Sequence, residues 1–314
     1  MSNRSNSNFY RRCIMLDDLL ASFAQKHHIE GLTAPSLIAL SEGRNEYSFN
    51  KAKRFLKFQR RINSELLKHR VITDNHYTEW FEHGEQNLAQ IKAFIIQFSV
   101  FSNQFLIAQL HKMIHADTLE SMRASKEILA NEIGVRFKST RHSGGGKNLG
   151  STEGSVEGGT FHFGAGHFEW LYNLALKLGI SFTEIGQPKH GTKPTLFFCD
   201  ELIRLYGGDN YQASQAASYA VENWAAAGFW GQLIKGFHLF NERNGTDLPL
   251  GFFIWHDRLE CQHAAHTQEE LEELYFTLEL DEDSFIRYGN EMLDGVAAFW
   301  DGLDEQRRKL AAVH

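Results

Sequence analysis

The stretch HDRLECQH, residues 256–263, carries two histidines and a glutamate at spacings of four and three residues. On an α-helix, which turns about 100° per residue, His256, Glu260 and His263 fall within about 60° of one another and share one face. The preceding apolar sequence LGFFIW predicts that this face is buried, where a carboxylate is costly unless a cation or hydrogen bonds compensate it. A metal would supply that compensation, but the same spacing also occurs by chance on exposed helices, and the His-Glu-x-x-His spacing of zinc proteases is absent. The stretch alone does not decide between these alternatives, so further ligands are needed.

Three further ligand-type side chains lie in apolar segments. Glu132 follows apolar residues in ILANEIG, Glu222 lies among alanines and aromatics in SYAVENWAAAGFW, and His167 opens HFEWLYNLALKLG. Taken singly, such an acid more often reaches the edge of a bundle, and such a histidine more often only begins a helix. Jointly, three carboxylates and three imidazoles match the ligand set with which a helical bundle holds two iron ions.

The elements that must position these residues are expected to be helices. The chain has only four prolines, and apolar residues recur at steps of three and four with no long alternation of period two. An all-α fold without an internal repeat is therefore predicted, and a sheet is not expected. The expected helices cover residues 16–27, 50–69, 88–114, 118–134, 167–179, 195–207, 211–237, 253–276 and 282–310.

One segment, residues 138–166, is rich in glycine and serine and is expected to be a mobile insertion or lid near the site. Its GGGK sequence does not make a phosphate loop, because Arg141 and Asn148 occupy the positions that need glycine and Ser or Thr. We divide the chain into an N-terminal helical extension (1–75) and a metal-binding bundle (76–314).

Composition limits the classes of partner. A net charge of −7 argues against nucleic acid, and the basic residues 51–61 are interpreted as the solvated face of a helix. The three cysteines have no metal-like or disulfide-like spacing, which favours a reducing compartment. The polar N-terminus is unlike a signal peptide. No apolar run approaches the length of ~20 residues that a membrane span needs, so no membrane-spanning helix is expected. The sequence predicts a soluble, cytoplasmic protein that binds no membrane and can form a homodimer.

From about Trp80 to Phe276, the order of elements resembles that of the haem-oxygenase-like diiron oxidase family. The sequence AQIKAFIIQFSVFSNQF resembles the second long helix of that family. The sequence ESMRASKEILANEIG resembles its segment ending in asparagine, glutamate and glycine, and HFEWLYNLALKLG resembles its histidine-led helix. The resemblance implies a haem-oxygenase-like helical bundle.

The last motif of that family is His, three residues, Asp or Glu, two residues, His, and residues 256–263 satisfy it. The resemblance implies two iron ions and O2 as a co-substrate. It also implies oxidation or C–C or C–N cleavage of a small carboxylate-bearing substrate, such as an amino acid or a fatty acid, with an electron donor as a further partner. The implied iron ligands are Glu132, His167, Glu222, His256, Glu260 and His263.

The chain departs from the family at two places. The Gly-rich insertion separates Glu132 from His167, which relatives hold a few residues apart, and Glu260 stands where many relatives have Asp. Near Glu222, the side chains of Tyr219 and Trp224 are candidates for a substrate pocket, although aromatics at such positions are more often core.

Two other functions are consistent with the sequence. Relatives with the same fold work without metal, some by hydrolysing thiamine with a cysteine nucleophile, a role for which Cys199 is the candidate, and others by oxidising a quinone precursor. A non-catalytic helical binding or scaffold protein is the second alternative. Neither alternative gives a purpose to six ligand-type residues.

Overall fold

The computed structural model describes residues 17–139 and 159–311, without the side chains of residues 120, 136–139, 159–163 and 259–266. Its secondary structure is predominantly helical, which confirms the all-α class. A helix at residues 17–27 is followed by α2 (Ala34–Ser41), α3 (Phe49–Glu65), α4 (Arg70–Thr73), α5 (His76–Phe81), α6 (Leu88–Ile114), α7 (Leu119–Glu132), α8 (His167–Lys177), α9 (Lys193–Glu201), α10 (Tyr211–Ala225), α11 (Phe229–Asn244), α12 (Gly251–Thr277) and α13 (Glu282–Ala311).

The described chain falls into two compact units. The first unit contains the described chain up to Asn75 together with Gln212–Phe229 and Asp257–Asp294. The second unit contains His76–Tyr211, Trp230–His256 and the described chain from Gly295 onward. Helices α12 and α13 each contribute residues to both units, so neither unit is one continuous segment. The division into residues 1–75 and 76–314 stays a prediction.

In the second unit, α6 is the central apolar helix. An 18-residue window of α6 has a mean hydropathy of 1.4, and the helix is long and apolar enough to cross a membrane, although no apolar run of that length was expected from the sequence. Half of that window is buried in the protein. Phe94 and Phe98 are fully buried, and both pack against Phe253 and Trp300. Core packing thus accounts for the apolar residues of α6 around Phe94 and Phe98.

A buried polar side chain on α6 also orders the chain that precedes α9. The Gln97 side-chain oxygen accepts hydrogen bonds from the backbone N–H of Thr192 and the hydroxyl of Thr195, each at 2.8 Å. Its Nε2 donates to the carbonyl of His190 at 2.9 Å. A buried amide with such partners is satisfied within the protein.

The helix expected over residues 211–237 is in fact two helices. α10 ends at Ala225 and α11 begins at Phe229. Gly228 lies between them with φ of +92°, a left-handed conformation that glycine adopts without steric cost. The alanines before Gly228 favour a helix, so the sequence pattern does not indicate that α10 ends there.

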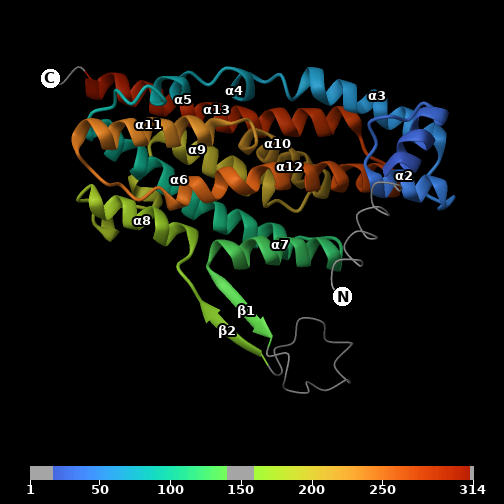
Figure 1. Cartoon of the computed structure of the whole chain (residues 1–314), viewed down its shortest axis with the longest axis horizontal. Coiled ribbons are helices and arrows are strands. Elements are labelled where there is room, and N and C mark those ends of the chain that lie inside the picture. Colours follow the sequence, from blue (N-terminus) through green and yellow to red (C-terminus); the bar gives the residue numbers. More distant parts are fainter. Residues whose placement is uncertain (1–16, 140–158, 312–314) are drawn as a thin grey trace, which may run out of the picture. The chain divides into compact units, whose positions relative to one another are not determined.

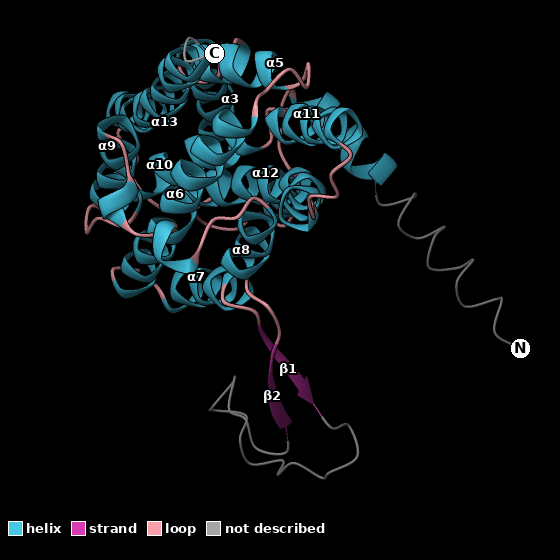
Figure 2. Cartoon of the chain, turned by 90° about the vertical axis from the view of Figure 1, so that its left-hand side faces the viewer, coloured by secondary structure: helices cyan, strands magenta, loops and turns pink. Residues whose placement is uncertain are grey.

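The flanks of the Gly-rich segment form a two-stranded hairpin, although no sheet was expected. Strand β1 (Val135–Ser139) pairs antiparallel with β2 (Gly159–Phe163), with Val135 opposite Phe163. Figures 1 and 2 show the two strands leaving the helices from the ends of α7 and α8. Residues 140–158 lie outside the described residues, and the expectation of a lid falls on them.

In the first unit, aromatic rings join α3 to the end of α12 and the start of α13. The ring of Phe58 lies 5.6 Å from those of both Tyr275 and Phe285, and the ring of Phe55 lies 5.1 Å from that of Tyr275. Phe55, Phe58 and Phe285 are fully buried. These contacts form the core of the unit that contains the N-terminal helices.

A fully buried carboxylate holds helix α2 in the first unit. Glu272 accepts hydrogen bonds from the backbone N–H of Thr33, the residue before α2, from its hydroxyl at 2.6 Å, and from Gln268. Replacing Glu272 with Gln removes the charge and leaves a donor facing other donors, so we expect unfolding free energy to fall by about 2 kcal/mol in urea titrations. Glu273→Gln, an exposed neighbour, should change it by less than about 0.5 kcal/mol. Equal losses in the two variants would contradict this role.

Candidate metal centre

Three predicted ligands converge in the second unit. Candidate ligand atoms of Glu132, His167 and His256 all lie within 4.8 Å of one another. They come from the last residue of α7, the first residue of α8 and the first turns of α12. His167 is buried, and Glu132 and His256 are partly buried.

Glycines bring Glu132 and His167 together despite the insertion between them. The N–H of Gly164 donates to the carbonyl of Gly134 at 2.8 Å, and Gly134 has φ of +73°. A Cβ at Gly134 would lie 2.6 Å from the carbonyl oxygen of Gly164, and one at Gly166 would lie 2.8 Å from that of Glu132. Only glycine permits this close crossing. The chain can therefore run out along β1 and back along β2 while Glu132 and His167 remain close together.

The contact between Glu132 and His167 has the distance of an ion pair but not the geometry of a hydrogen bond. The His167 Nδ1 lies 2.9 Å from a carboxylate oxygen of Glu132. This nitrogen is buried and makes no hydrogen bond to any residue that the structure describes. A buried polar atom without a hydrogen bond costs about 1–3 kcal/mol. A cation between the imidazole and the carboxylate would remove that cost, so these residues fit a metal ion.

His256 is held in the tautomer that suits a ligand. Its Nδ1 lies 2.7 Å from the carbonyl oxygen of Phe252. Because a carbonyl can only accept, Nδ1 must carry the proton, and the lone pair of the neutral ring is then on Nε2. Ligand histidines are commonly oriented by such a hydrogen bond from the second ring nitrogen.

Indole rings cover both imidazoles. Trp170 stacks on His167 at 5.1 Å between ring centroids, and Trp230 stacks on His256 at 4.9 Å. Trp255 lies edge-on to His167 at 6.4 Å. Sequence reasoning missed these neighbours, although Trp170 follows His167 by three residues on a helix and Trp255 directly precedes His256. The aromatic rings limit the motion of both imidazoles and shield their faces from water.

The other predicted ligands stay predictions. Glu222 is partly buried on α10, within the first unit. Glu260 and His263 lie on α12, but their side chains are outside the described part of the structure.

Of the two candidates for a substrate pocket, Tyr219 is buried and its hydroxyl donates a hydrogen bond to the side-chain oxygen of Gln268 at 3.3 Å. Trp224 is also buried and stacks on Phe229.

Cys199 does not have the environment of a nucleophile. Its side chain is buried on α9, and burial raises the pKa of its thiol to about 12. A thiolate, not a thiol, attacks an electrophile, so the thiol should be unreactive at neutral pH.

We therefore expect Cys199 to react with a disulfide reagent at pH 8 only after unfolding, in a chain whose other cysteines are replaced (Cys13→Ser, Cys261→Ser). The pKa is higher in the folded state than the usual value of about 8.5, so this group also favours folding below about pH 9 and loses that contribution as the pH rises toward 12. Rapid labelling of the folded protein would contradict this assignment.

Comparisons with known proteins agree on the fold. No sequence-family model matches the chain, and no curated protein matches it in sequence. A solved domain of unknown function with a haem-oxygenase-like fold, from Shewanella denitrificans OS217, has a TM-score of 0.53 and 13% identity, covering 83% of this chain and 95% of its own.

A CADD-like protein of unknown function from Nostoc punctiforme PCC 73102 is also similar. One of its structures gives a TM-score of 0.53 with 16% identity, covering 83% of this chain and 99% of its own. A second structure of the same protein gives 0.51 with 15% identity, covering 83% and 96%. At such identities the likeness shows the fold alone. The chain has a haem-oxygenase-like helical fold, as its sequence resemblance implied.

Proposed function

We propose that this protein is a non-haem iron enzyme that uses O2 to oxidise or cleave a small carboxylate-bearing substrate. The observation that carries the proposal is the convergence of Glu132, His167 and His256, with a buried imidazole nitrogen beside a carboxylate and no hydrogen bond between them. Two histidines and one carboxylate form the ligand set of non-haem Fe(II) sites that react with O2.

Each of the three residues has a separate task in this proposal. His256 would offer its Nε2, because Nδ1 is committed to Phe252. Glu132 would offset part of the positive charge, and His167 would supply the buried nitrogen. Ferrous iron, if held by these three residues, would supply the electrons that reduce O2. The indoles of Trp170 and Trp230 would keep water from the faces of both imidazoles.

A second iron is part of the proposal. Glu222, Glu260 and His263 are the further ligands that the family resemblance implies for the pair of irons. With three carboxylates for two Fe(II) ions, the charges of metal and ligands nearly balance, so the pair would be bound at little electrostatic cost. We further propose a cytoplasmic location, an external electron donor and a homodimeric state.

O2 consumption tests the proposal. Protein loaded with Fe(II) without oxygen should consume O2 slowly alone and faster with one class among amino acids, fatty acids and aromatic acids. The same protein loaded with Zn(II) should consume none, because zinc has no redox chemistry. Absence of uptake with every class would overturn the oxidase proposal. It would leave a metal-free enzyme or a scaffold as the function.

A further inference from the structure

Positive charge is concentrated on helix α3 of the first unit. Residues 50–61 contain six basic side chains and no acidic one, in a chain with a net charge of −7. Like charges three and four residues apart on a helix destabilise it. Carboxylates or carbonyl groups elsewhere in the protein can offset this repulsion for those cations that contact them.

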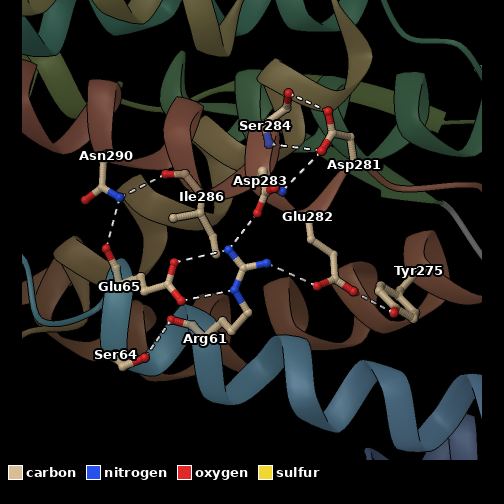
Figure 3. Close-up of polar contacts among 10 residues, drawn as sticks. All are labelled: Arg61, Ser64, Glu65, Tyr275, Asp281, Glu282, Asp283, Ser284, Ile286 and Asn290. Atoms are coloured by element: carbon tan, nitrogen blue, oxygen red, sulfur yellow. Dashed lines mark hydrogen bonds and ion pairs between the residues drawn. The ribbon is translucent and has the colours of Figure 1, made fainter.

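Two of the six basic residues attach α3 to the rest of the first unit. Figure 3 shows the Arg61 guanidinium between Glu65, Glu282 and Asp283, with its closest contact, to Asp283, at 2.7 Å. The Lys51 ammonium donates to the carbonyl of Phe276 at 2.8 Å. These two cations have a structural role.

The other four basic side chains of α3 are exposed. We define the basic face as Lys53, Arg54, Lys57 and Arg60. None of the four forms an ion pair with any carboxylate that the structure describes. Lys53, Lys57 and Arg60 fall within about 60° of one another, opposite the buried side chains of α3.

Exposed cations on α13 differ from those of the basic face, because they are paired. Arg287 pairs with Glu291 in the first unit, and Lys309 pairs with Glu305 in the second. Single exposed lysines such as Lys126 and Lys177 also form no ion pair with a carboxylate that the structure describes, so the clustering of four such cations on one helix is what distinguishes α3.

We infer that the basic face docks the acidic surface of a partner protein. The face is short, since Lys53 and Arg60 are about 10 Å apart along the helix axis. Carboxylates lie at one end of the basic face. Glu65 follows it on α3, and the Asp283 side chain, which contacts Arg61, is 84% exposed. A protein with a matching acidic patch fits this limited area, and complementary charges would speed its association.

Two other anionic partners fit less well. Long uniform polyanions such as DNA would extend beyond the face and meet Glu65 and Asp283. An anionic membrane would favour apolar side chains that insert between lipids. The only large exposed apolar side chain on α3 is Phe49, which stacks on His27 at 4.3 Å.

A short acidic probe tests the inference. A fluorescent hexaglutamate peptide is titrated in low salt into the full chain, into a face variant and into a control variant. The face variant combines Lys53→Gln, Arg54→Gln, Lys57→Gln and Arg60→Gln. The control combines Lys26→Gln, Lys126→Gln, Lys177→Gln and Lys189→Gln, which removes the same charge from exposed, scattered positions. Circular dichroism checks that both variants remain folded.

We expect the face variant to bind the peptide at least about tenfold more weakly and the control to change by less than about twofold. Carbodiimide coupling of the peptide carboxylates should then map to the amines of Lys53 and Lys57. Equal weakening in both variants, or no measurable binding to the unmodified chain, would overturn the inference. So would tighter binding of duplex DNA or of phosphatidylserine vesicles, or a dimer of the unmodified chain that only the face variant loses.

Discussion

Replacing His167 with alanine is expected to weaken Fe(II) binding by more than about 100-fold. Loss of a residue that only orients a ligand commonly costs 10- to 100-fold in metal affinity, and His167 is itself a proposed ligand. The variant should remain folded, because the vacated space beside Glu132 is polar and can admit water. Iron retained after anaerobic loading and desalting is the measurement, and circular dichroism monitors the fold.

The matched control is His238→Ala, which removes an exposed histidine from α11 in the same unit. It should retain as much iron as the unmodified chain. Tryptophan fluorescence gives a second reading, because Trp170 and Trp230 stack on the candidate ligands and a bound paramagnetic ion such as Co(II) should quench them. Unchanged iron content in His167→Ala would remove this residue from the proposed site.

Gly236→Ala is expected to destabilise the second unit by about 3 kcal/mol or more. A Cβ at Gly236 on α11 would overlap the carbonyl oxygen of Phe81 and lie 2.6 Å from its ring. A backbone carbonyl cannot move away as a flexible side chain can, so α11 and α5 would have to separate. Urea unfolding followed by circular dichroism measures the loss.

Gly251→Ala serves as the control for this substitution. Gly251 is exposed at the start of α12, and an added Cβ there would meet no atom within 4 Å. Alanine favours helix, so stability should stay the same or rise by up to about 1 kcal/mol. If both variants unfold at the same urea concentration, the close approach of α5 and α11 is not needed for stability.

Helical periodicity predicted some elements well and others poorly. The bounds expected for Leu88–Ile114 are those of α6, because its long apolar pattern has a capping box at Asn87 and no internal glycine. The break at Gly228 was missed, since one glycine after alanines gives a weak signal. The strands flanking the Gly-rich segment were missed because each is only five residues long.

The site was partly predictable for a similar reason. Residue types and spacing singled out Glu132, His167 and His256, which the structure brings together. Their proximity could not be derived from spacing, because it depends on the glycine crossing at Gly134 and Gly166. That crossing is a tertiary contact between segments that the whole insertion separates in sequence. Local sequence patterns cannot predict such a contact.

The most direct test of the proposed metal centre is anomalous X-ray scattering at the iron edge, from crystals grown with Fe(II) in the absence of oxygen. We predict a peak within bonding distance of the carboxylate of Glu132, the imidazole of His167 and the Nε2 of His256. An iron peak elsewhere in the molecule would contradict the account. So would the absence of any iron peak from crystals in which the protein is folded and Glu132, His167 and His256 lie as described here.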